Sequence, residues 1–212
     1  MTAPPGPTEP TPIGILLSGR GSNFLALYRA IEAGEVPARI ALVLSNKEEA
    51  KGLQKARELG LEVAVLSHRG KTRKAHDRLV VEALRRAGVE WVCLAGYMRI
   101  LSPVLVDAYP NRILNIHPSL LPAFPGLDAQ RQAWDYGVRV AGCTVHLVDH
   151  GLDSGPIVMQ KAIDADSVET AEALSKRILE EEHQVYPRAL GLMIRGSWRI
   201  EGRRVVFLEE SA

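Results

Sequence analysis

The chain has 212 residues, of which 46% are hydrophobic and 24% charged, and its formal net charge is +1. This length suits one large domain with a substantial core. The near-zero charge argues against nucleic acid or an anionic membrane as the main partner, although a small anionic ligand needs only a local site. The purely apolar runs are strand-sized, below the ~20 residues of a membrane span, so we expect a soluble cytoplasmic protein.

The first twelve residues, "MTAPPGPTEPTP", contain five prolines. No basic region is followed by an apolar one, so the segment is not a secretory signal. We predict a disordered N-terminal tail over residues 1–12 and one α/β domain over residues 13–212.

The first half alternates compact apolar runs with amphipathic stretches. Strands are predicted at 13–18, 39–46, 61–67 and 89–96, and helices at 24–34, 48–60 and 71–88. Apolar strands that alternate with helices predict a parallel sheet covered on both faces, as in nucleotide-binding folds.

The second half is less regular. We predict a short helix at 102–109, a strand at 112–116, a helix at 127–137, strands at 140–149 and 155–164, a long helix at 169–195 and two terminal strands at 198–202 and 203–210. The fold class is therefore α/β, a mostly parallel twisted sheet with helices on both faces, Rossmann-like in its first half, with antiparallel additions in its second half. Cys93 and Cys143 lie in apolar surroundings and are expected to be reduced core residues.

The glycine-rich turn "SGRGSN" at 18–23 links the first strand to a helix. Such a turn exposes backbone N–H groups at the positive end of the helix dipole, which suits a phosphate. Gly19 and Gly21 supply G-x-G, but Phe24 replaces the third glycine and no acidic residue ends the second strand, which favours a single phosphate over NAD. The alternative is a turn that only allows close packing.

The strand at 112–116 delivers Asn115 and His117 to its carboxyl end, where ligands bind in open α/β sheets. Residues two apart in a strand point to the same side, so the amide and the imidazole should converge. An Asn can donate to a developing oxyanion, and a His can carry a proton near neutral pH. The alternative is a capping Asn and a structural His. Pro118, Pro122 and Pro125 are expected to stiffen the loop that follows.

Two further stretches could carry chemistry. Asp153 lies in a glycine-flanked loop, which suits a functional carboxylate or merely a turn. The i, i+3, i+4, i+7 spacing of His146, Asp149, His150 and Asp153 would form a metal-binding face on a helix, but the β-branched sequence argues against a helix, and we expect no metal. The apolar segment 94–103 could line a slot for a flat ligand or belong to the core.

Several motifs together resemble the phosphoribosylglycinamide formyltransferases of purine biosynthesis. They are "LSGRGSN", "LSN", "LAGYMRILSP", "LNIHPSLLPAFPG", "GCTVHLV", "LDSGPI" and "EEEHQVYP", in order between residues 13 and 195. The resemblance implies the formyltransferase fold. It also implies transfer of a formyl group from 10-formyltetrahydrofolate to the amine of glycinamide ribonucleotide, by direct attack and without a covalent enzyme intermediate.

The resemblance also implies roles for individual residues. The catalytic residues would be Asn115, His117 and Asp153; the glycinamide ribonucleotide site would comprise Gly21, Ser22 and Asn23 at the phosphate and Glu182 at the ribose; and the folate site would comprise Arg73, Met98, Arg99, Ile100, Leu101 and Asn115. Gln130 stands where many members have His, which puts one substrate contact in doubt. Only small-molecule partners are implied, and a homodimer is compatible with the resemblance.

Three alternative functions remain open. A methionyl-tRNA formyltransferase would carry a second, basic domain, which the charge disfavours. A 10-formyltetrahydrofolate hydrolase would carry a regulatory domain before the fold, for which we expect no room. A non-catalytic binding module could have lost His117 or Asp153.

Overall fold

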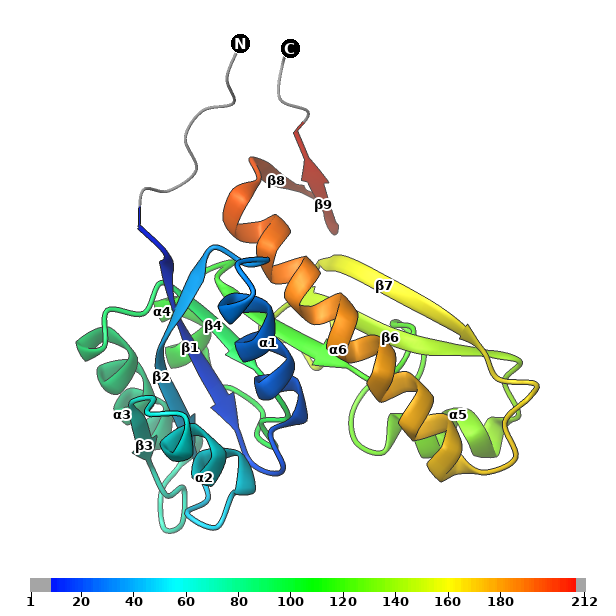
Figure 1. Ribbon diagram of the computed structural model, residues 1–212, viewed down its shortest axis with the longest axis horizontal. Coiled ribbons are helices and arrows are strands. Elements are labelled where there is room, and N and C mark those ends of the chain that lie inside the picture. Colours follow the sequence, from blue (N-terminus) through cyan, green and yellow to red (C-terminus); the bar gives the residue numbers. More distant parts are fainter. Residues whose placement is uncertain (1–8, 209–212) are drawn as a thin grey trace.

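The computed structural model describes residues 9–208. The elements are β1 (Thr11–Leu17), α1 (Ser22–Glu32), β2 (Ala38–Ser45), α2 (Lys51–Glu58), β3 (Val63–Val65), α3 (Arg73–Arg86), β4 (Trp91–Leu94), α4 (Pro103–Ala108), β5 (Ile113–His117), α5 (Ala129–Tyr136), β6 (Val140–Leu147), β7 (Ile157–Asp164), α6 (Ala171–Arg195), β8 (Trp198–Glu201) and β9 (Arg204–Phe207). Within these residues the strands form one nine-stranded sheet in the order β3-β2-β1-β4-β5-β6-β7-β9-β8 (Figure 1).

The parallel half of the sheet runs from β3 to β5. Strand β1 pairs in parallel with β2 and β4, β2 with β3, and β4 with β5. The direction then reverses, because β6 pairs antiparallel with both β5 and β7, and β8 with β9. The predicted fold class is therefore confirmed, including the antiparallel additions in the second half.

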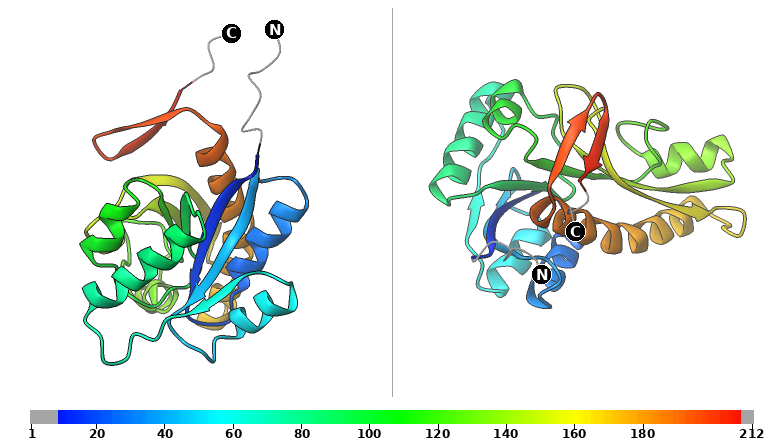
Figure 2. Two further views of the ribbon diagram at one scale, coloured as in Figure 1. Left: turned by 90° about the vertical axis from the view of Figure 1, so that its left-hand side faces the viewer. Right: turned by 90° about the horizontal axis from the view of Figure 1, so that it is seen from above.

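Helices cover both faces of the sheet. Along β1, Ile13, Ile15 and Leu17 face the cluster that contains residues of α1, α2 and α6, whereas Leu16 faces the cluster formed with α3 and α4. Figure 2 shows α3 and α4 on one side of the strands and α1 and α2 on the other. The two faces of β1 thus follow the period of two that an extended chain imposes.

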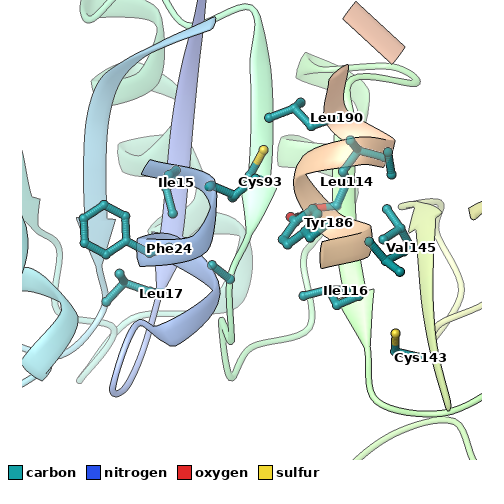
Figure 3. Packing of buried hydrophobic residues seen from close by; sticks show 14 of the residues in the cluster. Ile15, Leu17, Phe24, Cys93, Leu114, Ile116, Cys143, Val145, Tyr186 and Leu190 are labelled. Carbon is teal, nitrogen blue, oxygen red and sulfur yellow. Dashed lines mark hydrogen bonds between the residues drawn. The ribbon is translucent and has the colours of Figure 1, made fainter. Parts of the chain in front are cut away.

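The two cysteines are free and buried, as predicted. Figure 3 shows Cys93 and Cys143 at separate places in the apolar cluster around Tyr186, a residue of α6. Burial raises the pKa of each thiol to about 12. Both are therefore protonated core residues near neutral pH.

Some predicted boundaries were wrong. Strand β1 begins at Thr11, inside the predicted tail, because Thr11 N donates to Pro37 O at 3.0 Å and extends the pairing with β2. Residues 1–8 of that tail and residues 209–210 of the last predicted strand lie outside the described residues. Strand β3 has three residues rather than seven, because it pairs with β2 only from Val43 to Ser45.

The strand order places a switch point between β1 and β4. The chain leaves β1 for β2 on one side, and the later strands continue from β4 on the other. Ligands in open α/β sheets bind at such a point, outside the carboxyl ends of the strands. The glycine turn after β1, the segment after β4 and the end of β5 all lie at this edge. No helix within residues 9–208 has both the length and the apolar character needed to cross a bilayer.

Candidate active site

The glycine turn between β1 and α1 is held by a close backbone contact with α2. Gly21 has a φ of 75°, and a Cβ atom there would lie 2.7 Å from the Cα atom of Gly52. Gly52 N donates to Gly19 O at 3.0 Å, which fixes the same contact. Gly21 therefore has a packing reason to be glycine, and as the N-cap of α1 it offers no side chain to the N–H groups of the first turn.

A buried carboxylate lies next to this turn. Asn23 Nδ2 donates to Glu182 Oε2 at 2.7 Å, across 159 residues of sequence, because α6 packs on α1. Both residues are buried. Burial raises the pKa of Glu182 from 4.5 to about 7, and the hydrogen bond from Asn23 only partly opposes this. Within the described chain Asn23 Oδ1 has no hydrogen-bond partner, so this pair retains polar capacity for a ligand.

Asn115 is oriented by a histidine that was not among the predicted site residues. His146 on β6 pairs with Asn115 on β5 in the antiparallel register, so both side chains share one face. His146 Nδ1 lies 2.9 Å from Leu147 O and must donate to it, so Nε2 of a neutral ring accepts from Asn115 Nδ2 at 3.1 Å. Burial lowers the pKa of His146, which keeps the ring neutral. Asn115 retains a second N–H for a ligand.

His117 is held between a carbonyl and a carboxylate. Its Nε2 lies 2.8 Å from Phe124 O and donates to it, while its Nδ1 lies 3.5 Å from Asp153 Oδ2. Asp153 Oδ2 also accepts from Gly126 N at 2.8 Å. The ring is buried, with 4% of the residue exposed. Since Phe124 occupies Nε2, Nδ1 is the nitrogen available for proton exchange.

Both partners of His117 have unusual backbone conformations. Phe124 has a φ of 52° and Asp153 a φ of 47°, a region that non-glycine residues rarely adopt. Residues held in such conformations concentrate at functional sites, where the surrounding structure maintains the strain. The two residues that fix His117 are therefore themselves held in costly conformations.

The proline loop is tied to the sheet by polar side chains. Thr144 Oγ1 donates to Ser119 O at 2.7 Å and accepts from Leu121 N at 3.0 Å. Gln160 Nε2 donates to Leu121 O at 2.9 Å. The proline loop is therefore held by hydrogen bonds from side chains of β6 and β7, in addition to the stiffness that its prolines were predicted to provide.

The predicted folate residues lie on the same edge. Met98, Arg99, Ile100 and Leu101 form an irregular segment after β4, in which Met98 is 61% and Ile100 54% exposed. Arg73 is the first residue of α3 and is exposed. The segment thus presents large apolar side chains to solvent, which is unusual for core residues and suits an apolar ligand.

No metal-binding cluster of three or more His, Cys, Asp or Glu residues occurs within residues 9–208. The four residues with helical spacing are not on a helix, since His146 lies in β6 and Asp149, His150 and Asp153 in the following loop. His146 Nε2 is 3.8 Å from Asp153 Oδ1, so Asp153 lies between His146 and His117.

Gln130, which stands where many family members were expected to have His, is half-buried on α5.

An α/β sheet with a glycine turn, a buried carboxylate and a His–Asp pair at its switch point defines a small-molecule enzyme of the Rossmann-like class. A family model described as formyl transferase matches residues 12–190. The chain belongs to the formyl transferase family.

Relatives support this membership. The chain is 43% identical over 187 residues to the phosphoribosylglycinamide formyltransferase of Bacillus subtilis (strain 168), covering 86% of this chain and 96% of that protein. The crystal structure of glycinamide ribonucleotide transformylase 1 from Symbiobacterium toebii superposes with a TM-score of 0.91 at 48% identity, covering 94% of both chains.

A further relative is much longer. The trifunctional purine biosynthetic protein adenosine-3 of Drosophila pseudoobscura pseudoobscura is 45% identical over 190 residues, which are 88% of this chain but 14% of that protein. The chain therefore spans about a seventh of the length of that relative.

Proposed function

We propose that the protein transfers the formyl group of 10-formyltetrahydrofolate to the amine of glycinamide ribonucleotide, in purine biosynthesis. The observation that carries the proposal is that Asn115 and His117 lie two residues apart on β5 and that Asp153 lies close both to His117 and to His146, which accepts from Asn115. The glycine turn and the segment 98–101 follow the neighbouring strands β1 and β4 of the same sheet. The names of the Bacillus and Symbiobacterium relatives support the same substrate.

In the proposed reaction the substrate amine attacks the formyl carbon. A carbon–nitrogen bond forms to the amine, the bond to the folate nitrogen breaks, and one proton passes from the amine to that nitrogen. The free N–H of Asn115 and the Nδ1 side of the His117 ring face the oxyanion of the tetrahedral intermediate, which N–H donors would stabilise. Asp153, 3.5 Å from His117 Nδ1, orients the ring and can hold a water that relays the proton. Most of the acceleration comes from aligning two bound substrates.

The two substrates would occupy separate parts of this site. The phosphate of glycinamide ribonucleotide would bind the N–H groups of Gly21, Ser22 and Asn23, and its ribose would bind Glu182. The folate would lie against Met98, Arg99, Ile100 and Leu101, with Arg73 near its charged end. The apolar exposure of this segment supports the assignment.

We further propose a cytoplasmic location, small-molecule substrates, and neither nucleic acid nor a membrane as a partner. The reduced, buried state of Cys93 and Cys143 supports the first point. A homodimer stays a prediction, which the elution volume in size-exclusion chromatography checks.

A formyl-transfer assay tests the proposal. The protein is incubated with 10-formyltetrahydrofolate and, in parallel, with glycinamide ribonucleotide, water alone or charged initiator tRNA. We expect formylated glycinamide ribonucleotide and tetrahydrofolate in equal amounts. Release of formate at the same rate without the ribonucleotide would indicate a hydrolase instead, and formylation of the tRNA would indicate the other transferase.

A further inference from the structure

The segment that follows β4 is anchored at one end by a buried serine. Met98 N donates to Ser18 Oγ at 2.9 Å, and Ser18 Oγ donates to Asn46 Oδ1 at 2.6 Å. Ser18 and Asn46 are both buried. The backbone of Met98 is therefore fixed to the ends of β1 and β2.

The other end of the segment is anchored by a buried carboxylate. Ser102 N donates to Asp77 Oδ2 at 2.6 Å, and Asp77 is only 1% exposed. His76, which is fully buried, lies with Nδ1 3.3 Å from Asp77 Oδ1 and with Nε2 2.8 Å from Leu66 O. Because Nε2 faces a carbonyl it must donate, so a proton between Nδ1 and the carboxylate satisfies both groups.

The two anchors lead back to one stretch of chain. Asn46 Nδ2 lies 3.1 Å from Nδ1 of His68, while His76 reaches Leu66, two residues earlier. Two series of hydrogen-bonded side chains therefore connect residues 66–68, which follow β3, to the backbone N–H groups of Met98 and Ser102. Between the anchors, Met98 and Ile100 are mostly exposed and only the side chain of Leu101 packs against the buried cluster under α3 and α4. The backbone hydrogen bonds at Met98 and Ser102 therefore fix the two ends of a segment that has little apolar packing of its own.

We infer that Asp77 and Ser18 are positioning residues for the formyl donor. They touch neither substrate and hold the segment 98–102 in the form that receives the folate. The inference rests on the proposed function, because that function assigns the segment to the folate. An anchored segment loses little conformational entropy on binding, whereas a loosened one must be ordered by the ligand, which weakens affinity for the donor only.

The test compares Asp77→Ala with Asp77→Asn. The alanine variant leaves Ser102 N without an acceptor, and we expect it to raise the KM for 10-formyltetrahydrofolate about tenfold, as expected for a lost charged hydrogen bond. The KM for glycinamide ribonucleotide should stay within about twofold. The asparagine variant retains an acceptor for Ser102 N and a donor toward a neutral His76, so it should restore the donor KM to within about threefold of the wild-type value.

Two further variants separate positioning from loss of fold. Leu84→Val removes a methylene from the buried core on the same helix, and it should leave both KM values unchanged. If Asp77→Ala does not fold, Ser18→Ala tests the other anchor with a smaller change and should raise the donor KM several-fold. An unchanged donor KM in whichever anchor variant folds, or an equal rise in both KM values, would overturn the inference.

Calorimetric titration with tetrahydrofolate gives a second readout that does not require turnover. Weaker binding by Asp77→Ala, with wild-type binding by Leu84→Val, supports the inference. Wild-type affinity in the alanine variant contradicts it. A wild-type protein that binds tetrahydrofolate but transfers no formyl group contradicts the proposed function instead, so the two failures are distinguishable.

Discussion

The buried Glu182 should make the stability of the ligand-free protein depend on pH. Glu182 is 5% exposed, its partner is the side chain of Asn23, and burial raises its pKa from 4.5 to about 7. Between these two values the folded state binds more protons than the unfolded state. The contribution of Glu182 to the free energy of unfolding is therefore fully present below about pH 4.5 and is lost as the pH rises through about 7.

The size of this loss follows from the shift. One pKa unit corresponds to about 1.4 kcal/mol, so the rise from 4.5 to about 7 corresponds to roughly 3.5 kcal/mol, most of it between pH 5 and pH 8. Glu182→Gln keeps an acceptor for Asn23 Nδ2 and does not ionise. We expect the variant to gain about 2 to 3 kcal/mol over the wild type between pH 5 and pH 8, while it loses affinity for glycinamide ribonucleotide.

Urea unfolding at pH 5, 6, 7 and 8 measures this difference directly. The control is Glu180→Gln, an exposed change on the same helix, whose difference from the wild type should stay within about 0.5 kcal/mol at every pH. The reasoning fails if the Glu182→Gln difference is constant across this range, since the carboxyl would then ionise equally in both states.

Three other substitutions test the site. His146→Phe keeps the ring but removes the acceptor of the Asn115 amide, and steady-state assays should show kcat about tenfold lower with both KM values nearly unchanged. Gly21→Ala should raise the KM for glycinamide ribonucleotide and cost more stability than Gly34→Ala, which has the same backbone conformation but an open site; similar urea midpoints would contradict this. Thr144→Val should cost about 1 to 3 kcal/mol of unfolding free energy by leaving Leu121 N without its acceptor, and a wild-type midpoint would contradict it.

Much of the fold could be predicted because the strands of the parallel half are buried on both faces. Runs such as 13–18 consist almost entirely of apolar residues and glycine, so they can be recognised as buried strands without knowledge of the neighbouring strands. The start of β1 at Thr11 was missed, because pairing with β2 there overrides the proline-rich composition. The short length of β3 was missed for the same reason, since pairing and not composition ends it.

The candidate site could be predicted where chemistry lies along one strand. Asn115 and His117 are two residues apart, so alternation alone brings them together. His146 required the antiparallel register of β5 and β6, and the polar pattern of "CTVHLV" was its only signal. Asp77 required the packing of α3 under the segment after β4, for which the sequence offers no local signal. Glu182 was predicted as a site residue only through the family resemblance, because its partner Asn23 lies 159 residues earlier in the sequence and the two come together only when α6 packs on α1.

The most direct test of the proposed mechanism is a single-turnover measurement with His117→Ala. Both substrates are bound at saturating concentration, and formyl transfer is followed after rapid mixing, with binding measured separately by calorimetry. We expect transfer to slow by about two or more orders of magnitude while the affinities for both substrates and the unfolding midpoint change little. Transfer at the wild-type rate in the folded variant would contradict the central role of the His117–Asp153 pair.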